Sequence, residues 1–158
     1  MTSHAHENHP VQPSLTCSAI QATLHCLTGC AIGEVLGMVI ATAFGLADAP
    51  SILIAIVLAF VFGYGLTLRP VVVAGVPFRR AIGLAFASDT LSITTMEVVD
   101  NAFILAVPGA ISAGLGDALF WWSLATSLAI AFFATVPVNR YLIARGRGHA
   151  VMHEFHAH

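Results

Sequence analysis

Four apolar runs, each about as long as a lipid bilayer is thick, constrain this chain more than any other feature. Short stretches with proline, glycine or charged residues separate the runs, which span about residues 24–47, 52–68, 82–107 and 118–142. A helix needs roughly 20 apolar residues to cross the hydrocarbon core of a bilayer. The sequence therefore predicts an all-α polytopic membrane protein with a bundle of four transmembrane helices. This domain would cover residues 24–148, between polar tails at 1–23 and 149–158.

The amino-acid composition is typical of a protein embedded in a lipid bilayer. Of the 158 residues, 58% are hydrophobic and only 9% are charged, whereas a soluble domain carries about 25% charged residues. The formal net charge is −2, so the electrostatic footprint of a nucleic-acid-binding protein is not present. The expected partner is the lipid bilayer, with no nucleic acid.

The arginines predict the orientation of the helices. They follow the second run or the fourth run, at Arg69, Arg79, Arg80, Arg140, Arg145 and Arg147. Basic residues flanking membrane spans favour the cytoplasmic side. We therefore expect both termini and the connection between the second and third runs to be cytoplasmic, in a multi-pass protein of the cell inner membrane. The third run is polar enough that a broken or re-entrant helix is an alternative to a continuous one.

A row of glycines marks one face of the first run. Gly29, Gly33 and Gly37 recur every fourth residue, and small residues at this spacing let another helix approach closely. The row predicts tight helix packing, and we expect it to support a homo-oligomer.

A second row on the same helix carries potential metal ligands. Cys26, Cys30, Glu34 and Met38 also recur every fourth residue, and His25 precedes them. Soft thiolate and thioether ligands favour copper(I), with zinc as the other candidate transition-metal ion. The simpler interpretation is that both cysteines act as small apolar residues in a helix interface. Glu34 lies deep in the predicted span, where an ionisable side chain is functional or paired.

The third run carries most of the remaining membrane-embedded acids. Asp89, Glu97 and Asp100 share one helix face, and Met96 adds a soft ligand beside them. Counting from the cytoplasmic ends, Asp89 and Glu34 reach similar depths and are expected to face each other. Two carboxylates in a dry site cannot both stay ionised unless a cation lies between them. The alternative is a static network in which Ser, Thr and Asn satisfy the acids.

The C-terminal tail is rich in histidine. His149, His153 and His156 lie close together, and short histidine-rich tracts commonly bind metal ions. A merely solvated tail is the alternative.

Several of these motifs also carry a family resemblance. They are His25-Cys26-Leu27-Thr28-Gly29-Cys30-Ala31-Ile32-Gly33-Glu34, Phe62-Gly63-Tyr64-Gly65-Leu66, Ser88-Asp89-Thr90-Leu91-Ser92-Ile93, Met96-Glu97-Val98-Val99-Asp100-Asn101 and Pro137-Val138-Asn139-Arg140. The chain resembles, over about residues 24–153, an uncharacterised bacterial family of small integral membrane proteins that is catalogued as a domain of unknown function. The resemblance implies a small helical membrane domain and no established activity.

The residues together predict a membrane protein that binds and transports a transition-metal cation, with copper favoured over zinc. Cys26 and Cys30 would hold the ion near the cytoplasmic mouth, and Glu34 with Asp89 would form the site in mid-membrane. One alternative is a four-helix thiol/quinone oxidoreductase that uses the cysteine pair. Another is a channel in which the buried acids conduct protons or a small solute. Motifs of hydrolases and phosphate-binding loops are not found, which favours a transport protein over an enzyme.

Overall fold

The structure is a computed structural model that describes residues 14–145. This part of the chain consists of four helices and their connections, with no β-strand, and the helices are α1 (Leu15–Phe44), α2 (Asp48–Val73), α3 (Phe78–Ala106) and α4 (Ala118–Ala144). Each helix is long and apolar enough to cross a membrane. The prediction of an all-α bundle of four transmembrane helices is confirmed.

The helices are longer than the apolar runs. They contain 26 to 30 residues, which corresponds to about 39–45 Å at 1.5 Å per residue, against a hydrocarbon core of about 30 Å. Their ends therefore reach beyond the hydrocarbon. α3 is one continuous helix despite its many polar side chains.

The start of α1 differs most from the expected boundary. We expected this helix to begin near residue 24, but it begins at Leu15, where the Ser14 hydroxyl accepts a hydrogen bond from the Cys17 backbone N–H over 3.3 Å. Residues 15–23 include Ser18, Ala19, Ala22 and Thr23, which are buried in the bundle. Small side chains that pack between helices give this segment a helical structure although its hydropathy is modest.

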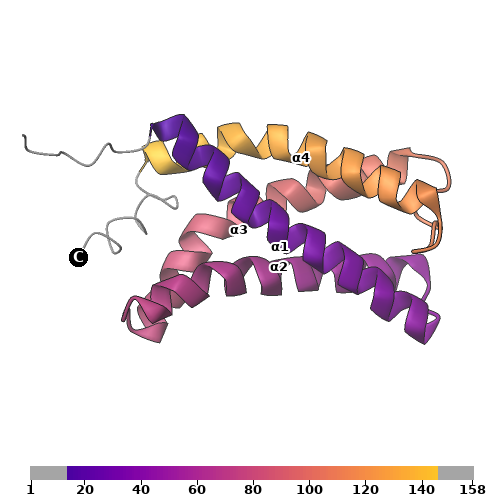
Figure 1. The fold of residues 1–158 in the computed structure, drawn as a ribbon, viewed down its shortest axis with the longest axis horizontal. Coiled ribbons are helices and arrows are strands. Elements are labelled where there is room, and N and C mark those ends of the chain that lie inside the picture. The colour runs from indigo at the N-terminus through magenta and orange to yellow at the C-terminus, as the bar shows by residue number, and fades with distance from the viewer. Residues whose placement is uncertain (1–13, 146–158) are drawn as a thin grey trace, which may run out of the picture.

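The four helices alternate in direction, so both ends of the described chain lie at the same end of the bundle (Figure 1). α1 runs diagonally across the bundle, from the end of α4 to the start of α2 (Figure 1). It packs against α2, α3 and α4. This crossing brings a single face of α1 into the interior along most of its length.

The glycine row of α1 is covered by α2 of the same chain. A Cβ atom added at Gly33 would lie 2.4 Å from the backbone nitrogen of Ala59, which shows that the two backbones are in contact. The neighbouring turns repeat this arrangement, with Gly29 against Gly63 and Gly37 against Ala55. The predicted close approach is confirmed. The expectation that the row supports a homo-oligomer gains no support, because these glycines pack against α2 of the same chain.

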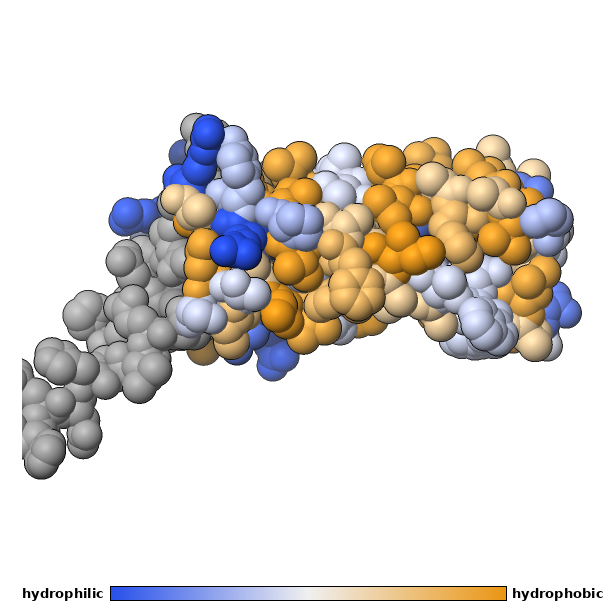
Figure 2. Space-filling view, turned by 90° about the horizontal axis from the view of Figure 1, so that it is seen from above, coloured by the Kyte–Doolittle hydropathy of each residue, from blue (hydrophilic) through white to orange (hydrophobic). Residues whose placement is uncertain are grey.

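The surface divides into an apolar middle and polar ends (Figure 2). One end, which we call the arginine end, carries the described arginines, which are Arg69, Arg79, Arg80, Arg140 and Arg145. The opposite end carries the exposed Trp121 and Trp122 at the start of α4. Side chains of this kind are typical of the two interfaces of a membrane protein.

Candidate functional site

Three carboxyl groups meet inside the half of the bundle farther from the arginine end. Glu34 of α1 lies within electrostatic range of Asp100 and Glu97 of α3. Glu97 is 5% exposed and Asp100 1% exposed. Among residues 14–145, each of these three side chains has one buried oxygen without a hydrogen-bond partner, namely Glu34 Oε1, Glu97 Oε1 and Asp100 Oδ2. We call Glu34, Glu97 and Asp100 the carboxyl cluster.

The pairing of acids across the interior differs from the expected one. Asp89 lies within electrostatic range of Cys26, and both residues are nearer the arginine end. Glu34 is instead close to Glu97 and Asp100. The expectation that Asp89 faces Glu34 is therefore wrong. Depths counted from residues 24 and 82 did not allow for the early start of α1 at Leu15 and for its diagonal course across the bundle.

Hydrogen bonds hold one side of both α3 acids of the carboxyl cluster. The Ser127 hydroxyl of α4 donates to Asp100 Oδ1. Asn101 donates through its side-chain nitrogen to the backbone oxygen of Glu97 over 2.9 Å and to Glu97 Oε2 over 3.5 Å. Among residues 14–145, the second oxygen of Glu97 and of Asp100 has no hydrogen-bond donor, so it can bind a proton or a cation.

Two sulfurs touch beside the carboxyl cluster. Cys30 Sγ lies 4.0 Å from Met96 Sδ, and the side chains are 1% and 0% exposed. We call Cys30 and Met96 the sulfur pair. Two sulfurs that bind one ion at about 2.3 Å each lie roughly 3.8–4.6 Å apart, depending on the angle at the metal. Glu97 is a near neighbour of Cys30, and Cys26 belongs to the same buried cluster.

The other predicted ligands lie elsewhere. Met38 is on the same face of α1 but lines a cavity near the far end of the bundle. His25 is half-buried, and its Nε2 lies 3.1 Å from the Thr67 hydroxyl of α2. The tail residues His149, His153 and His156 lie outside the described residues.

In the described part of the chain, the usual metal ligands do not gather into a larger group. Within residues 14–145, no group of three or more His, Cys, Asp and Glu side chains is arranged to hold a metal ion. The sulfur pair includes a methionine, which is a ligand for soft ions.

Sequence reasoning missed a polar network in the half of the interior nearer the arginine end. Asn139 of α4 donates to the Thr23 hydroxyl of α1 over 2.8 Å and accepts from the Ser92 hydroxyl of α3. Ser127 was missed as well. The signal for both was a row of small and polar residues at every fourth position of α4, which comprises Ser123, Ser127, Ala131, Thr135 and Asn139.

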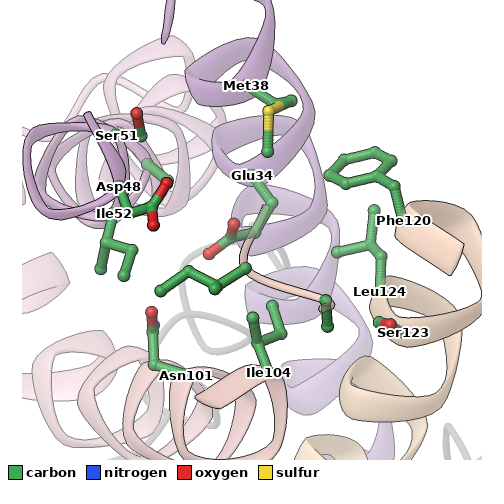
Figure 3. A pocket seen from close by; sticks show the side chains of 13 residues that line it. Glu34, Met38, Asp48, Ser51, Ile52, Asn101, Ile104, Phe120, Ser123 and Leu124 are labelled. Atoms are coloured by element: carbon green, nitrogen blue, oxygen red, sulfur yellow. The ribbon is translucent and has the colours of Figure 1, made fainter. Parts of the chain in front are cut away.

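A cavity opens next to the carboxyl cluster, near the end of the bundle that carries the tryptophans. Its polar lining includes Glu34 of α1, Asp48 at the start of α2 and Asn101 of α3 (Figure 3). Asp48 lies just beyond the first apolar run and was not predicted as a site residue. The close approach of α1 and α2 is what brings it to Glu34.

Comparison with known proteins identifies the family of this chain. A family described as a domain of unknown function, DUF4396, matches residues 17–148. The chain belongs to the DUF4396 family. No curated protein and no solved structure matches it. The resemblance to an uncharacterised family is confirmed, and DUF4396 membership brings no activity with it.

Proposed function

We propose that this DUF4396 protein binds a soft transition-metal cation inside the bundle, copper(I) in preference to zinc, and moves it across the membrane. The observation that carries this proposal is the contact between Cys30 Sγ and Met96 Sδ beside Glu97. Thiolate and thioether ligands select copper(I) among the first-row metals. The buried position suits an ion that has lost its water.

The carboxyl cluster supplies the charge that such an ion needs. A bare cation is costly at membrane depth unless charged groups of opposite sign accompany it. Glu34, Glu97 and Asp100 each offer an oxygen without a hydrogen-bond partner in the described residues. These oxygens would neutralise the cation as it approaches or leaves the sulfur pair.

The distribution of arginine supports an orientation for transport. The arginine end would face the cytoplasm of a bacterial cell and the tryptophan end the periplasm, in a multi-pass protein of the inner membrane. The ion would then pass between the cavity at the tryptophan end and the cytoplasmic side. There the tail residues His149, His153 and His156 would deliver or collect it.

A second candidate is proton conduction through the same acids. It is favoured by the finding that the His, Cys, Asp and Glu side chains of residues 14–145 form no group of three for a metal ion. A proton needs one acceptor oxygen at a time and no coordination shell. The carboxyl cluster meets that requirement as it stands.

Copper binding to the purified protein tests the first candidate. The full chain in lipid nanodiscs is titrated with copper(I) under anaerobic conditions, and the bound metal is counted by elemental analysis. We expect Cys30→Ser and Met96→Leu each to weaken binding at least tenfold, which corresponds to about 1.4 kcal/mol. Cys17→Ser is the matched control, because Cys17 is a free and exposed thiol on the same helix.

Two results would overturn the copper proposal. One is unchanged copper(I) affinity in Cys30→Ser and Met96→Leu. The other is an equal loss in Cys17→Ser, which would mean that any thiol on α1 binds the metal. Proton uptake by proteoliposomes in metal-free buffer, abolished by Glu97→Gln, would then support the second candidate.

A further inference from the structure

The cavity near the tryptophan end is a separate compartment from the sulfur pair. It lies between all four helices and is closed on one side by the segment that joins α3 to α4. Its apolar wall is made by side chains such as Ile52, Ile104, Phe120 and Leu124 (Figure 3). Its polar side chains are Glu34, Asp48, Ser51, Asn101 and Ser123.

The charge of the cavity favours a cation. Figure 3 shows the carboxyl groups of Glu34 and Asp48 directed toward the same space from two different helices. The described arginines lie at the other end of the bundle, since they occur at the end of α2, the start of α3 and the end of α4. No basic side chain of the described residues therefore lies beside these two carboxyl groups.

The size of the cavity limits what can occupy it. It offers about 50 Å³ to solvent, and one buried water occupies about 10–15 Å³ on this measure. The space therefore suits about three to five waters, or a small cation with part of its water.

Two residues connect the cavity to the buried acids. Glu34 lines the cavity and also belongs to the carboxyl cluster. Asn101 lines the cavity and donates to the backbone oxygen of Glu97 over 2.9 Å. Behind them, Glu97 Oε1 and Asp100 Oδ2 are buried without a hydrogen-bond partner among residues 14–145. A cation in the cavity thus has further carboxylate ligands ahead of it along the interior.

We propose that this cavity is the entry site of the protein, where Glu34 and Asp48 first hold a small metal cation that still carries part of its water. The inference rests on the proposed function and adds a first site to it. Carboxylate and amide oxygens are hard ligands, so the cavity selects its occupant by charge and size. Selection for a soft metal takes place later, at the sulfur pair, after the ion has lost its water.

Manganese(II) is the probe that separates the two sites, because it prefers oxygen ligands to sulfur. The full chain in nanodiscs is titrated with Mn(II), and the free ion is counted by electron paramagnetic resonance. We expect one saturable site whose affinity falls at least tenfold in Glu34→Gln and in Asp48→Asn. Asp117→Asn is the control, since this exposed acid lies at the same end of the bundle and does not line the cavity.

The outcome for the entry site is independent of the copper result. Retained Mn(II) binding in Cys30→Ser, together with lost copper(I) binding, supports both the entry site and the copper proposal. Retained Mn(II) binding with unchanged copper(I) binding upholds the entry site and overturns the sulfur pair as the metal site. The entry site is overturned if Mn(II) does not saturate a site, or if Asp48→Asn and Asp117→Asn have the same effect. Asp48 is exposed at the start of α2, so Asp48→Asn should not disturb the fold. This variant therefore tests the entry site even if Glu34→Gln unfolds the protein.

Discussion

The two halves of the bundle interior treat buried polar groups in opposite ways. In the half nearer the arginine end, the Asn139 side chain bonds to both Thr23 and Ser92, and His25 lies 3.1 Å from Thr67. In the other half, each acid of the carboxyl cluster keeps an oxygen without a hydrogen-bond partner in the described residues. The first half joins helices by satisfied hydrogen bonds, whereas the second keeps acceptors open.

We interpret this difference as that between a scaffold and the proposed ligand site. A buried polar group without a partner costs about 1–3 kcal/mol, so its presence in a native protein calls for an explanation. A proton or cation that binds the open oxygens would supply one. The division is not complete on the arginine side, where the buried Thr135 hydroxyl has no hydrogen-bond partner in the described residues and where a buried acid, Asp89, also lies.

The largest expected effect is a loss of copper(I) uptake when two acids of the carboxyl cluster are replaced by amides. In Glu97→Gln combined with Asp100→Asn, copper(I) uptake into proteoliposomes should fall by about 100-fold, at about tenfold or 1.4 kcal/mol per lost carboxylate. Stability should not fall, because a neutral amide is less costly to bury than an unpaired carboxylate. Thr126→Ala serves as the control, as its hydroxyl donates to the backbone oxygen of Trp122 on its own helix. Normal uptake in the double variant would contradict the ligand role of this half.

A smaller effect should come from the contact that both halves share. Gly33→Ala places a Cβ atom 2.4 Å from the backbone nitrogen of Ala59, so α1 and α2 must separate, at a cost of about 1–3 kcal/mol in the free energy of unfolding. The measurement is reversible unfolding in mixed detergent. Gly65→Ala is the matched control, because a Cβ atom there meets nothing within 4 Å. Equal stability of the two variants would show that this helix contact is not close.

A substitution in the half nearer the arginine end should lower stability more than it lowers metal binding. Asn139→Leu leaves the hydroxyls of Thr23 and Ser92 without their amide partner and should lower the free energy of unfolding by about 1–2 kcal/mol. Copper(I) affinity should remain within about threefold of the unchanged protein, which is less than 1 kcal/mol. A large loss of metal affinity at unchanged stability would break the comparison, because this half would then be part of the ligand site. Thr28→Val is the control, as Thr28 is exposed and bonds to its own helix.

The smallest effect is expected at the hydrogen bond between Ser127 and Asp100 of the carboxyl cluster. Ser127→Ala removes the hydroxyl that donates to Asp100 Oδ1, a change worth about 0.6 kcal/mol in a membrane protein. The free energy of unfolding should fall by that amount, with a change of a few-fold in copper(I) affinity. Rescue by Ser127→Thr would show that the hydroxyl, and not the volume of the side chain, is responsible.

Much of the candidate site could be predicted from the sequence because its residues repeat at every fourth position. The rows on α1 and α3 predicted that Cys30, Glu34, Glu97 and Asp100 face the interior. The same reasoning placed Met38 with the cysteines, although the structure has it in the cavity wall. A row on one helix fixes a face, but the partner helices change along that row.

The sequence by itself determined the four helices, the burial of the acids and the face of α1 that packs closely. These properties depend on the length of an apolar run and on helical spacing, which are local. The tertiary structure alone decided which acids meet and which helix covers the glycines, because both depend on where α1 begins and on its diagonal course between α4 and α2. It also brought Asp48 to Glu34, since two residues on different helices share a cavity only when their backbones pack together.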